Sequence, residues 1–211
     1  MLMYFGNAKT NLKETCAMRI AEIERKTSET SISVKWNLDG TGYGQIDTGI
    51  PFMDHMLTLF ARHGGFDLEV KADGDLDVDC HHTMEDLGLT MGHALTQAIG
   101  TKEGIRRYGS FLLPMDESLA LVALDLSGRP FLVYDVTPPA EYIKDLDTAL
   151  FKEFFQAFAV KGGITLHIRM LSSGEVHHVF EAIFKGLSRT LANAVSMDPR
   201  MKGIPSTKGT L

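Results

Sequence analysis

The stretch HHTME at residues 81–85 occurs a second time, as HHVFE at residues 177–181. These two motifs lie 96 residues apart. A second landmark repeats as well, because the glycine pairs at 64–65 and 162–163 lie 98 residues apart and each precedes a stretch of alternating apolar and polar residues. Two landmarks with nearly equal offsets indicate an internal duplication of the chain.

Alternation of apolar and polar side chains predicts strands in both halves of the duplicated chain. The clearest cases are residues 32–36, 66–70, 119–126, 131–136 and 164–170. The third and fourth of these stretches are joined by a Ser-Gly-Arg-Pro turn at residues 127–130.

Apolar residues spaced three and four apart predict four helices with one buried face each. They cover residues 52–60, 84–98, 151–158 and 180–191. Each half then reads strand, helix, Gly-Gly, strand, loop and His-His helix. We predict an α+β fold of two similar halves, each a small mixed sheet with two helices packed on one face. The expected segments are a flexible leader at 1–18, halves at 19–102 and 103–197, and a C-terminal loop at 198–211.

Composition disfavours nucleic-acid-binding, disulfide-rich and membrane-spanning proteins. A chain of 211 residues with 44% hydrophobic residues can bury a substantial core. The net charge of −6 disfavours a nucleic-acid partner, which would require a basic face. Cys16 and Cys80 are too few for a disulfide framework, and no apolar stretch of membrane-spanning length occurs. We therefore expect a cytoplasmic protein without a membrane partner.

The repeated motif carries groups that bind transition metals. Residues four apart on a helix share a face, so His81 and Glu85 point to one spot, as do His177 and Glu181. Imidazole with carboxylate suits Mn, Fe, Zn or Ni better than Ca or Mg. A single His-His pair is more often a surface or capping feature. Its repetition favours a metal site, because core packing gives no reason to repeat polar residues.

The duplication also relates His55 to Glu153, 98 residues further on, at matching places on two predicted helices. Both side chains can ligate a metal, although an ordinary exposed helix glutamate remains an open alternative for Glu153. The candidate ligands are His55, His81, His82, Glu85, Glu153, His177, His178 and Glu181. Eight ligands are too many for one ion and suit two.

Basic and hydroxyl side chains point to an anionic substrate. Arginine and lysine together with hydroxyl groups are a common phosphate-binding combination, although each alone is usually a solvated surface residue. The candidates are Arg107, Arg129, Lys185, Ser206, Thr207 and Lys208. Lys185 lies one helical turn after Glu181, on the same predicted face.

Six segments of the chain are distinctive when taken together. They are NLDGTG at 37–42, GIPFMDHM at 49–56, DCHHTMED at 79–86, LSGRP at 126–130, HHVFEA at 177–182 and IPSTKG at 204–209. In this order they are highly specific, and they resemble the imidazoleglycerol-phosphate dehydratase family of histidine biosynthesis. The resemblance runs from about Arg19 to Leu211.

The resemblance implies a hydro-lyase that removes water from imidazoleglycerol phosphate to give imidazole acetol phosphate. It implies two manganese ions per active site that bind the substrate imidazolate, with ligands from neighbouring subunits of a hollow homo-oligomer of 24 subunits. Glu29, Glu181 and His82 match the family's catalytic positions, with the acid and base roles of the two glutamates left undivided. The six basic and hydroxyl residues named above match positions that hold the substrate and its phosphate.

Two positions depart from the family pattern. Glu153 stands where some relatives carry histidine, and Leu59 stands where some carry a glutamine near the substrate. Two other functions remain open from the residues alone. One is a metal-storage or metal-assembled structural protein, and the other is a metallohydrolase acting on a phosphate ester.

Overall fold

The computed structural model describes residues 18–211, so nearly all of the predicted leader, together with Cys16, lies outside the described residues. The first half contains β1 (Ile20–Lys26), β2 (Thr30–Asn37), β3 (Gly44–Asp47), α1 (Pro51–Gly64), β4 (Asp67–Gly74) and α2 (His81–Ile99). The second half contains β5 (Tyr108–Met115), β6 (Ser118–Asp125), β7 (Phe131–Asp135), β8 (Tyr142–Ile143), β9 (Leu146–Asp147), α3 (Leu150–Gly162), β10 (Thr165–Ser172) and α4 (Val176–Val195).

The two halves share one topology. Their sheets have the strand orders β1-β2-β4-β3 and β5-β6-β10-β7, and in each the last strand runs parallel to its neighbour. The registers agree as well, since Val34 pairs with Val70 in the first sheet and Val122 pairs with Ile168 in the second. The predicted duplicated α+β fold with mixed sheets is thus confirmed. The turn at 127–130 joins β6 to β7, but β10 lies between these strands.

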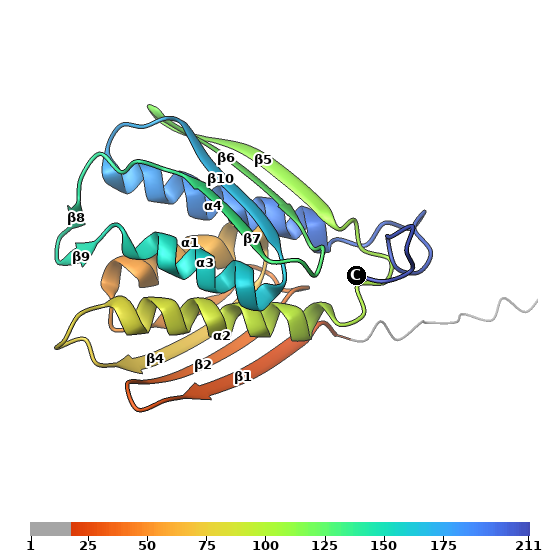
Figure 1. The fold of residues 1–211 in the computed structure, drawn as a ribbon, viewed down its shortest axis with the longest axis horizontal. Helices are drawn as coiled ribbons and strands as arrows, with labels where there is room; N and C mark the ends of the chain where they lie inside the picture. Colours follow the sequence, from red (N-terminus) through yellow and green to blue (C-terminus); the bar gives the residue numbers. More distant parts are fainter. Residues whose placement is uncertain (1–17) are drawn as a thin grey trace, which may run out of the picture.

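The helices lie between the two sheets, which form the outer layers of the molecule (Figure 1). Helix α2 packs on α3, and α1 packs on α4, so both contacts join one half to the other. A single apolar core runs across both halves. The fully buried Trp36 of β2, for example, stacks on Phe158 of α3 with ring centroids 6.5 Å apart. No helix in residues 18–211 combines the length and apolar character needed to cross a membrane.

Three strands and one hairpin were not predicted. Strand β1 carries charged residues at four of its seven positions, and β3 has only four residues, so both give a weak alternating pattern. Strand β5 contains a proline and leaves several apolar side chains exposed. The hairpin β8–β9 lies in the connection between β7 and α3, which is longer than the equivalent connection between β3 and α1. These elements form because neighbouring strands and helices provide their partners.

A difference in loop length explains why the two offsets in the sequence disagree. Six residues separate Gly74 at the end of β4 from His81, but four separate Ser172 at the end of β10 from His177. The second connection is therefore two residues shorter, which reduces the offset from 98 to 96. The longer first connection contains Asp75, whose carboxylate contacts His82.

Candidate active site

Three of the eight predicted metal ligands converge at one place. Glu181 Oε1 lies 2.9 Å from His55 Nε2 on α1 and 3.0 Å from His177 Nε2 on α4. The three ligand atoms all lie within 4.8 Å of one another. The other carboxylate oxygen, Oε2, pairs with Lys185 one turn further along α4. Two imidazoles and one carboxylate form a donor set that suits a borderline transition metal.

The environment of Glu181 keeps its carboxylate ionised. The residue is buried, with 8% of its surface exposed. Burial raises the pKa of Glu181, but the hydrogen bonds from Lys185, His55 and His177 outweigh it and lower the pKa to about 2. At neutral pH this group is therefore a fixed negative charge among cationic or neutral donors.

His178 follows His177 on α4 and is turned about 100° from it, so it contacts other groups than the three-residue cluster does. His82 holds the equivalent position at the start of α2. His82 Nδ1 lies 2.9 Å from Asp75 Oδ2 and 3.8 Å from Glu29 Oε2. His178 Nδ1 lies 3.1 Å from Glu117 Oε1 and 3.2 Å from its Oε2.

These carboxylates change the proton affinity of their histidines. The hydrogen bond from Asp75 raises the pKa of His82, and that from Glu117 raises the pKa of His178. Backbone N–H groups of Glu117 and Glu175, followed by His178, lower the pKa of Glu117 to about 2. Asp116 also lies near His178, at 3.9 Å from Nε2.

The remaining three candidates do not form a matching cluster. By the repeat, Glu153, His81 and Glu85 are the counterparts of His55, His177 and Glu181. Glu85 is exposed, and Glu153 and His81 are half-buried. Within residues 18–211, the only groups of three or more side chains arranged to hold a metal are the His55 cluster and Asp116, Glu117 and His178. One chain thus assembles one of the two equivalent ligand sets.

A cavity of about 700 Å³ opens beside His55 and His177. Phe52 and Cys80 line it, and Lys144 and Asp145 of the β8–β9 hairpin close one side. The Cys80 thiol is half-buried, and this burial raises its pKa. The cavity gives the histidine cluster an opening large enough for a small molecule.

A second cavity, of about 520 Å³, lies where the C-terminal tail meets the end of β6. It is lined by five of the six predicted substrate-binding residues, namely Arg107, Arg129, Ser206, Thr207 and Lys208. The sixth, Lys185, is absent from this lining and lies beside Glu181 instead. The five residues bring cationic side chains and hydroxyl groups together, which is the chemistry of a phosphate site.

Arg107 organises this second cavity. Its guanidinium donates from Nε to Asp125 at 2.7 Å, from Nη2 to Asp125 at 3.0 Å and from Nη1 to the Pro205 carbonyl oxygen at 2.8 Å. Its backbone has a φ of 73°, a left-handed conformation that is uncommon outside glycine and asparagine. Arg107 therefore anchors the tail, whereas Arg129, with 72% of its side chain exposed, is available to a ligand.

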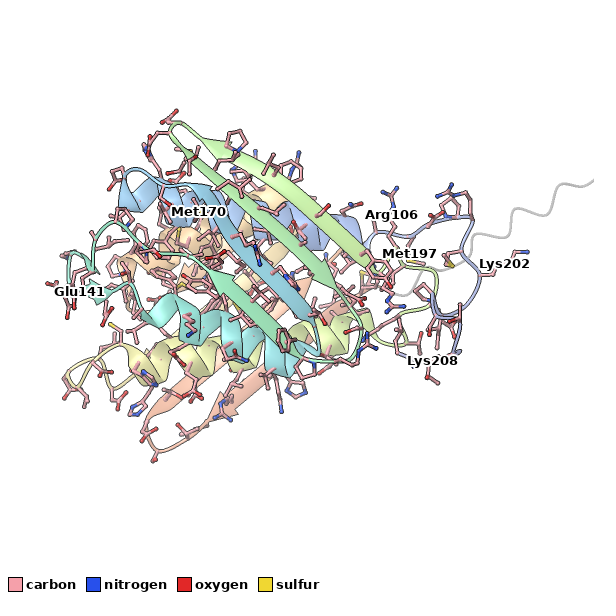
Figure 2. The ribbon with its side chains drawn as sticks, turned by 45° about the horizontal axis from the view of Figure 1, so that its top comes forward. Arg106, Glu141, Met170, Met197, Lys202 and Lys208 are labelled. Atoms are coloured by element: carbon pink, nitrogen blue, oxygen red, sulfur yellow. The ribbon has the colours of Figure 1, made fainter. Side chains whose placement is uncertain are left out.

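The two cavities lie at opposite ends of the molecule. Helix α4 carries His177 in its first turn and ends at Val195 just before the tail. A helix of 20 residues is about 30 Å long. Lys208 in the tail and Glu141, next to the β8–β9 hairpin, lie at opposite ends in Figure 2. One small substrate cannot contact both regions of a single chain.

Asp75, Asp116 and Glu117 were not predicted from the sequence. Only the strand registers reveal that Glu117 is the repeat equivalent of Glu29, because each directly precedes the first residue of its strand, Ser118 or Thr30. That offset is 88 residues, which differs from the offsets of both landmarks. A search for the repeat equivalent of Glu29 at an offset of 96 or 98 residues therefore does not find Glu117.

Comparisons with known proteins agree with one another. A family model described as imidazoleglycerol-phosphate dehydratase matches residues 48–191. An imidazoleglycerol-phosphate dehydratase of Methylorubrum extorquens is 55% identical over 92% of this chain and all of its own length. One of Desulforamulus reducens is 56% identical over 92% of this chain and 98% of its own length.

Solved structures give the same result. Imidazoleglycerol-phosphate dehydratase from Staphylococcus aureus superposes with a TM-score of 0.77 at 37% identity, over 85% of this chain and 99% of the other. The Pyrococcus furiosus protein in complex with (S)-C348 also gives a TM-score of 0.77, at 38% identity, over 90% of this chain and all of the other.

Proposed function

This chain belongs to the imidazoleglycerol-phosphate dehydratase family, and on that premise we propose that it converts imidazoleglycerol phosphate to imidazole acetol phosphate at a site that binds two manganese ions. Family membership makes the chain a dehydratase of histidine biosynthesis that acts on a small molecule. The observation that carries the proposed metal chemistry is the convergence of His55, His177 and Glu181 on one point.

The donor set fits the proposed metal. His55 Nε2, His177 Nε2 and Glu181 Oε1 would hold one ion, because their atoms already face one another. His81, His82, Glu85, Glu153 and His178 supply the remaining proposed ligands. When bound, the metal supplies Lewis acidity that holds the substrate's imidazole ring and stabilises negative charge on it. Lys185 neutralises Glu181 Oε2, which leaves Oε1 directed at the histidines.

The second cavity, which lies beside the C-terminal tail and is called the tail cavity below, is the proposed phosphate site. Arg129 and Lys208 bring positive charge, and Ser206 and Thr207 bring hydroxyl donors. Arg107 keeps the tail in place through Pro205, and Asp125 fixes the plane of its guanidinium. These side chains would hold the phosphate and thereby position the reacting carbon atoms at a fixed distance from it.

Separation of the two cavities supports a site shared between copies of the chain. The proposed ligand cluster and the proposed phosphate site cannot meet on one substrate within a single chain. The incomplete counterpart cluster of Glu153, His81 and Glu85 points the same way, because a neighbouring chain can supply the missing group. The proposed assembly is therefore a homo-oligomer, of 24 subunits as the family resemblance implies.

The environments of the two catalytic glutamates suggest different roles. A carboxylate whose pKa is about 2 accepts a proton poorly at neutral pH, which suits Glu181 to metal binding. Glu29 lies in the β1–β2 turn with 50% of its side chain exposed, 3.8 Å from His82. We assign to Glu29 the transfer of the carbon-bound proton, with His82 beside it.

The other two functions considered from the sequence are less well supported. Membership of an enzyme family removes the reason to assume a metal-storage or structural protein. A metallohydrolase would release inorganic phosphate from the same substrate, whereas a dehydratase retains the phosphate ester and gives a ketone.

The decisive experiment incubates purified protein with Mn²⁺ and imidazoleglycerol phosphate and measures both imidazole acetol phosphate and free phosphate. We expect the ketone product without phosphate release, and about two manganese ions per active site by elemental analysis. Release of phosphate without ketone would reverse the assignment in favour of hydrolysis. Absence of bound metal in active protein would remove the proposed di-manganese site.

A further inference from the structure

We propose that Asp75 and Glu117 are positioning residues for the metal site: each holds the Nδ1 proton of a neighbouring histidine, His82 or His178, and so leaves Nε2 of that histidine free to bind metal. This inference rests on the proposed function, because it assigns a task to residues around the same site. Neither carboxylate belongs to the predicted ligand set.

Contacts of the two histidines have the same form. His82 Nδ1 is 2.9 Å from Asp75 Oδ2, and His178 Nδ1 is 3.1 Å from Glu117 Oε1. In both cases the Nδ1 atom meets a carboxylate, which accepts and does not donate a hydrogen bond at neutral pH. A neutral histidine in this position therefore carries its proton on Nδ1. Such outer carboxylates fix the tautomer and ring orientation of ligating histidines.

Glu117 is itself held in place. Its Oε1 accepts a hydrogen bond of 2.8 Å from the N–H of Glu175, immediately before α4, and one of 3.2 Å from Ser118 Oγ. The carboxylate thus links the β5–β6 turn to the start of the helix that carries His178. A residue anchored at two elements can hold an imidazole ring at a defined angle.

The duplication gives an independent reason to regard the contact as functional. Glu117 occupies the repeat position of Glu29, whereas Asp75 lies in the β4–α2 connection, which is two residues longer than its counterpart. The two halves therefore reach the same carboxylate–imidazole contact from different elements. The same contact is thus present in both halves, although residues at non-equivalent repeat positions make it.

The two halves therefore differ in which glutamate remains free. In the second half, the Glu117 carboxylate is hydrogen-bonded to His178. In the first half, Asp75 takes the equivalent contact, so Glu29 stays 3.8 Å from His82 and remains available. The inference explains why Glu29, and not its repeat equivalent Glu117, is free for the proton transfer assigned to it above.

A tautomer measurement tests the inference without metal. We would record ¹⁵N solid-state NMR spectra of histidine-labelled, metal-free protein at a pH where the imidazoles are neutral, and assign His82 and His178 with single His→Gln variants. We expect Nδ1–H signals for both residues in the unsubstituted protein. In Asp75→Asn and Glu117→Gln the amide can donate to Nδ1, so each variant should shift its own histidine towards the Nε2–H form.

Metal affinity provides the second readout, with Asp77→Asn as the matched control. Asp77 is exposed and lies two residues after Asp75 in the same connection. We would titrate each metal-free protein with Mn²⁺ and follow free Mn²⁺ by EPR. Asp75→Asn and Glu117→Gln should weaken Mn²⁺ binding about 10- to 100-fold, whereas Asp77→Asn should leave it unchanged. Circular dichroism and particle size confirm that each variant is folded.

The outcomes separate this inference from the proposed function. Protonated Nε2 atoms in the unsubstituted protein, or folded variants with unchanged Mn²⁺ affinity, would overturn the positioning role while leaving the metal site intact. If the unsubstituted protein binds no Mn²⁺, the metal site fails, and the NMR spectra still decide whether the carboxylates set the tautomers.

Discussion

Glu181 and Glu29 are both carboxylates of the proposed site, yet their surroundings differ. Glu181 is buried and accepts from His55, His177 and Lys185. Glu29 lies in an exposed turn and has His82 at 3.8 Å. Because a metal ligand and a proton-transfer group need opposite environments, substitutions at the two positions should have separable effects.

Replacement of each glutamate by glutamine tests this separation at the residue scale. Glu29→Gln should lower turnover about 10²- to 10⁴-fold while bound manganese stays at the unsubstituted level, because only proton transfer is removed. Glu181→Gln should lower both turnover and bound manganese, because a ligand is lost. Turnover and metal content are measured on the same preparations, with Glu103→Gln, an exposed position, as the control. Equal metal loss in both variants would contradict the division.

The pH dependence of stability tests the interactions of Glu181. Its pKa is lowered from 4.5 to about 2 in the folded chain, so its contribution to stability is complete above pH 4.5 and is lost as the pH falls towards 2. In metal-free protein, we expect the Tm difference between the unsubstituted chain and Glu181→Gln to be largest near pH 5 and to shrink as the solution is acidified. A difference that stays constant over this range would show that the carboxylate is not held as described.

At the scale of elements, the packing of α2 on α3 depends on glycine. A Cβ atom added at Gly88 would lie 2.4 Å from the Phe154 carbonyl oxygen and 2.9 Å from Ala157 Cβ. The backbones of the two helices therefore approach more closely than any larger residue permits. Because α2 belongs to the first half and α3 to the second, this contact fixes how the halves sit together.

Gly88→Ala should destabilise the protein even though alanine is the better helix former. The gain in helix propensity is about 1 kcal/mol, but relief of the clash requires the helices to separate and repack the core. We expect a net loss of about 1–3 kcal/mol, measured by denaturant unfolding. Gly162→Ala is the matched control, because its Cβ would meet its neighbours at 3.6–3.7 Å, an ordinary contact distance. Equal effects at both glycines would mean that the close approach does not limit packing.

At the scale of the whole molecule, the separation of the two cavities makes a prediction about mixed assemblies. Glu181→Gln damages the metal end of α4, and Arg129→Ala damages the tail cavity. If each active site combines the metal end of one chain with the tail of another, co-expression of the two inactive variants should restore roughly a quarter of full activity, as random assembly would give.

The control pairs two variants with damage at the same end. Co-expressed Glu181→Gln and His177→Ala should remain inactive, because every chain then carries a defective His55 cluster. Recovery of activity in this control, or its absence in the Glu181→Gln and Arg129→Ala mixture, would argue against sites built from two chains. Each mixture is assayed after its particle size has been shown to match that of the unsubstituted protein.

Much of the fold follows from the sequence alone. The repeated HHxxE motif and the paired glycines revealed the duplication, and apolar stripes located the four helices, because helical and strand periodicities are local properties of the chain. The same local geometry placed Lys185 beside Glu181. Strands β1, β3 and β5 were not predicted, because their formation depends on pairing with other strands of the sheet.

The arrangement of the site was decided by the tertiary structure. Spacing on one helix cannot show that His55 of α1 meets His177 and Glu181 of α4, or that the equivalent three residues remain apart in one chain. Nor can it show that Asp75 and Glu117 reach the second histidines from different elements. The physical reason is that helix faces depend on residues three and four apart, whereas these contacts depend on strand register, loop length and the packing of one half against the other.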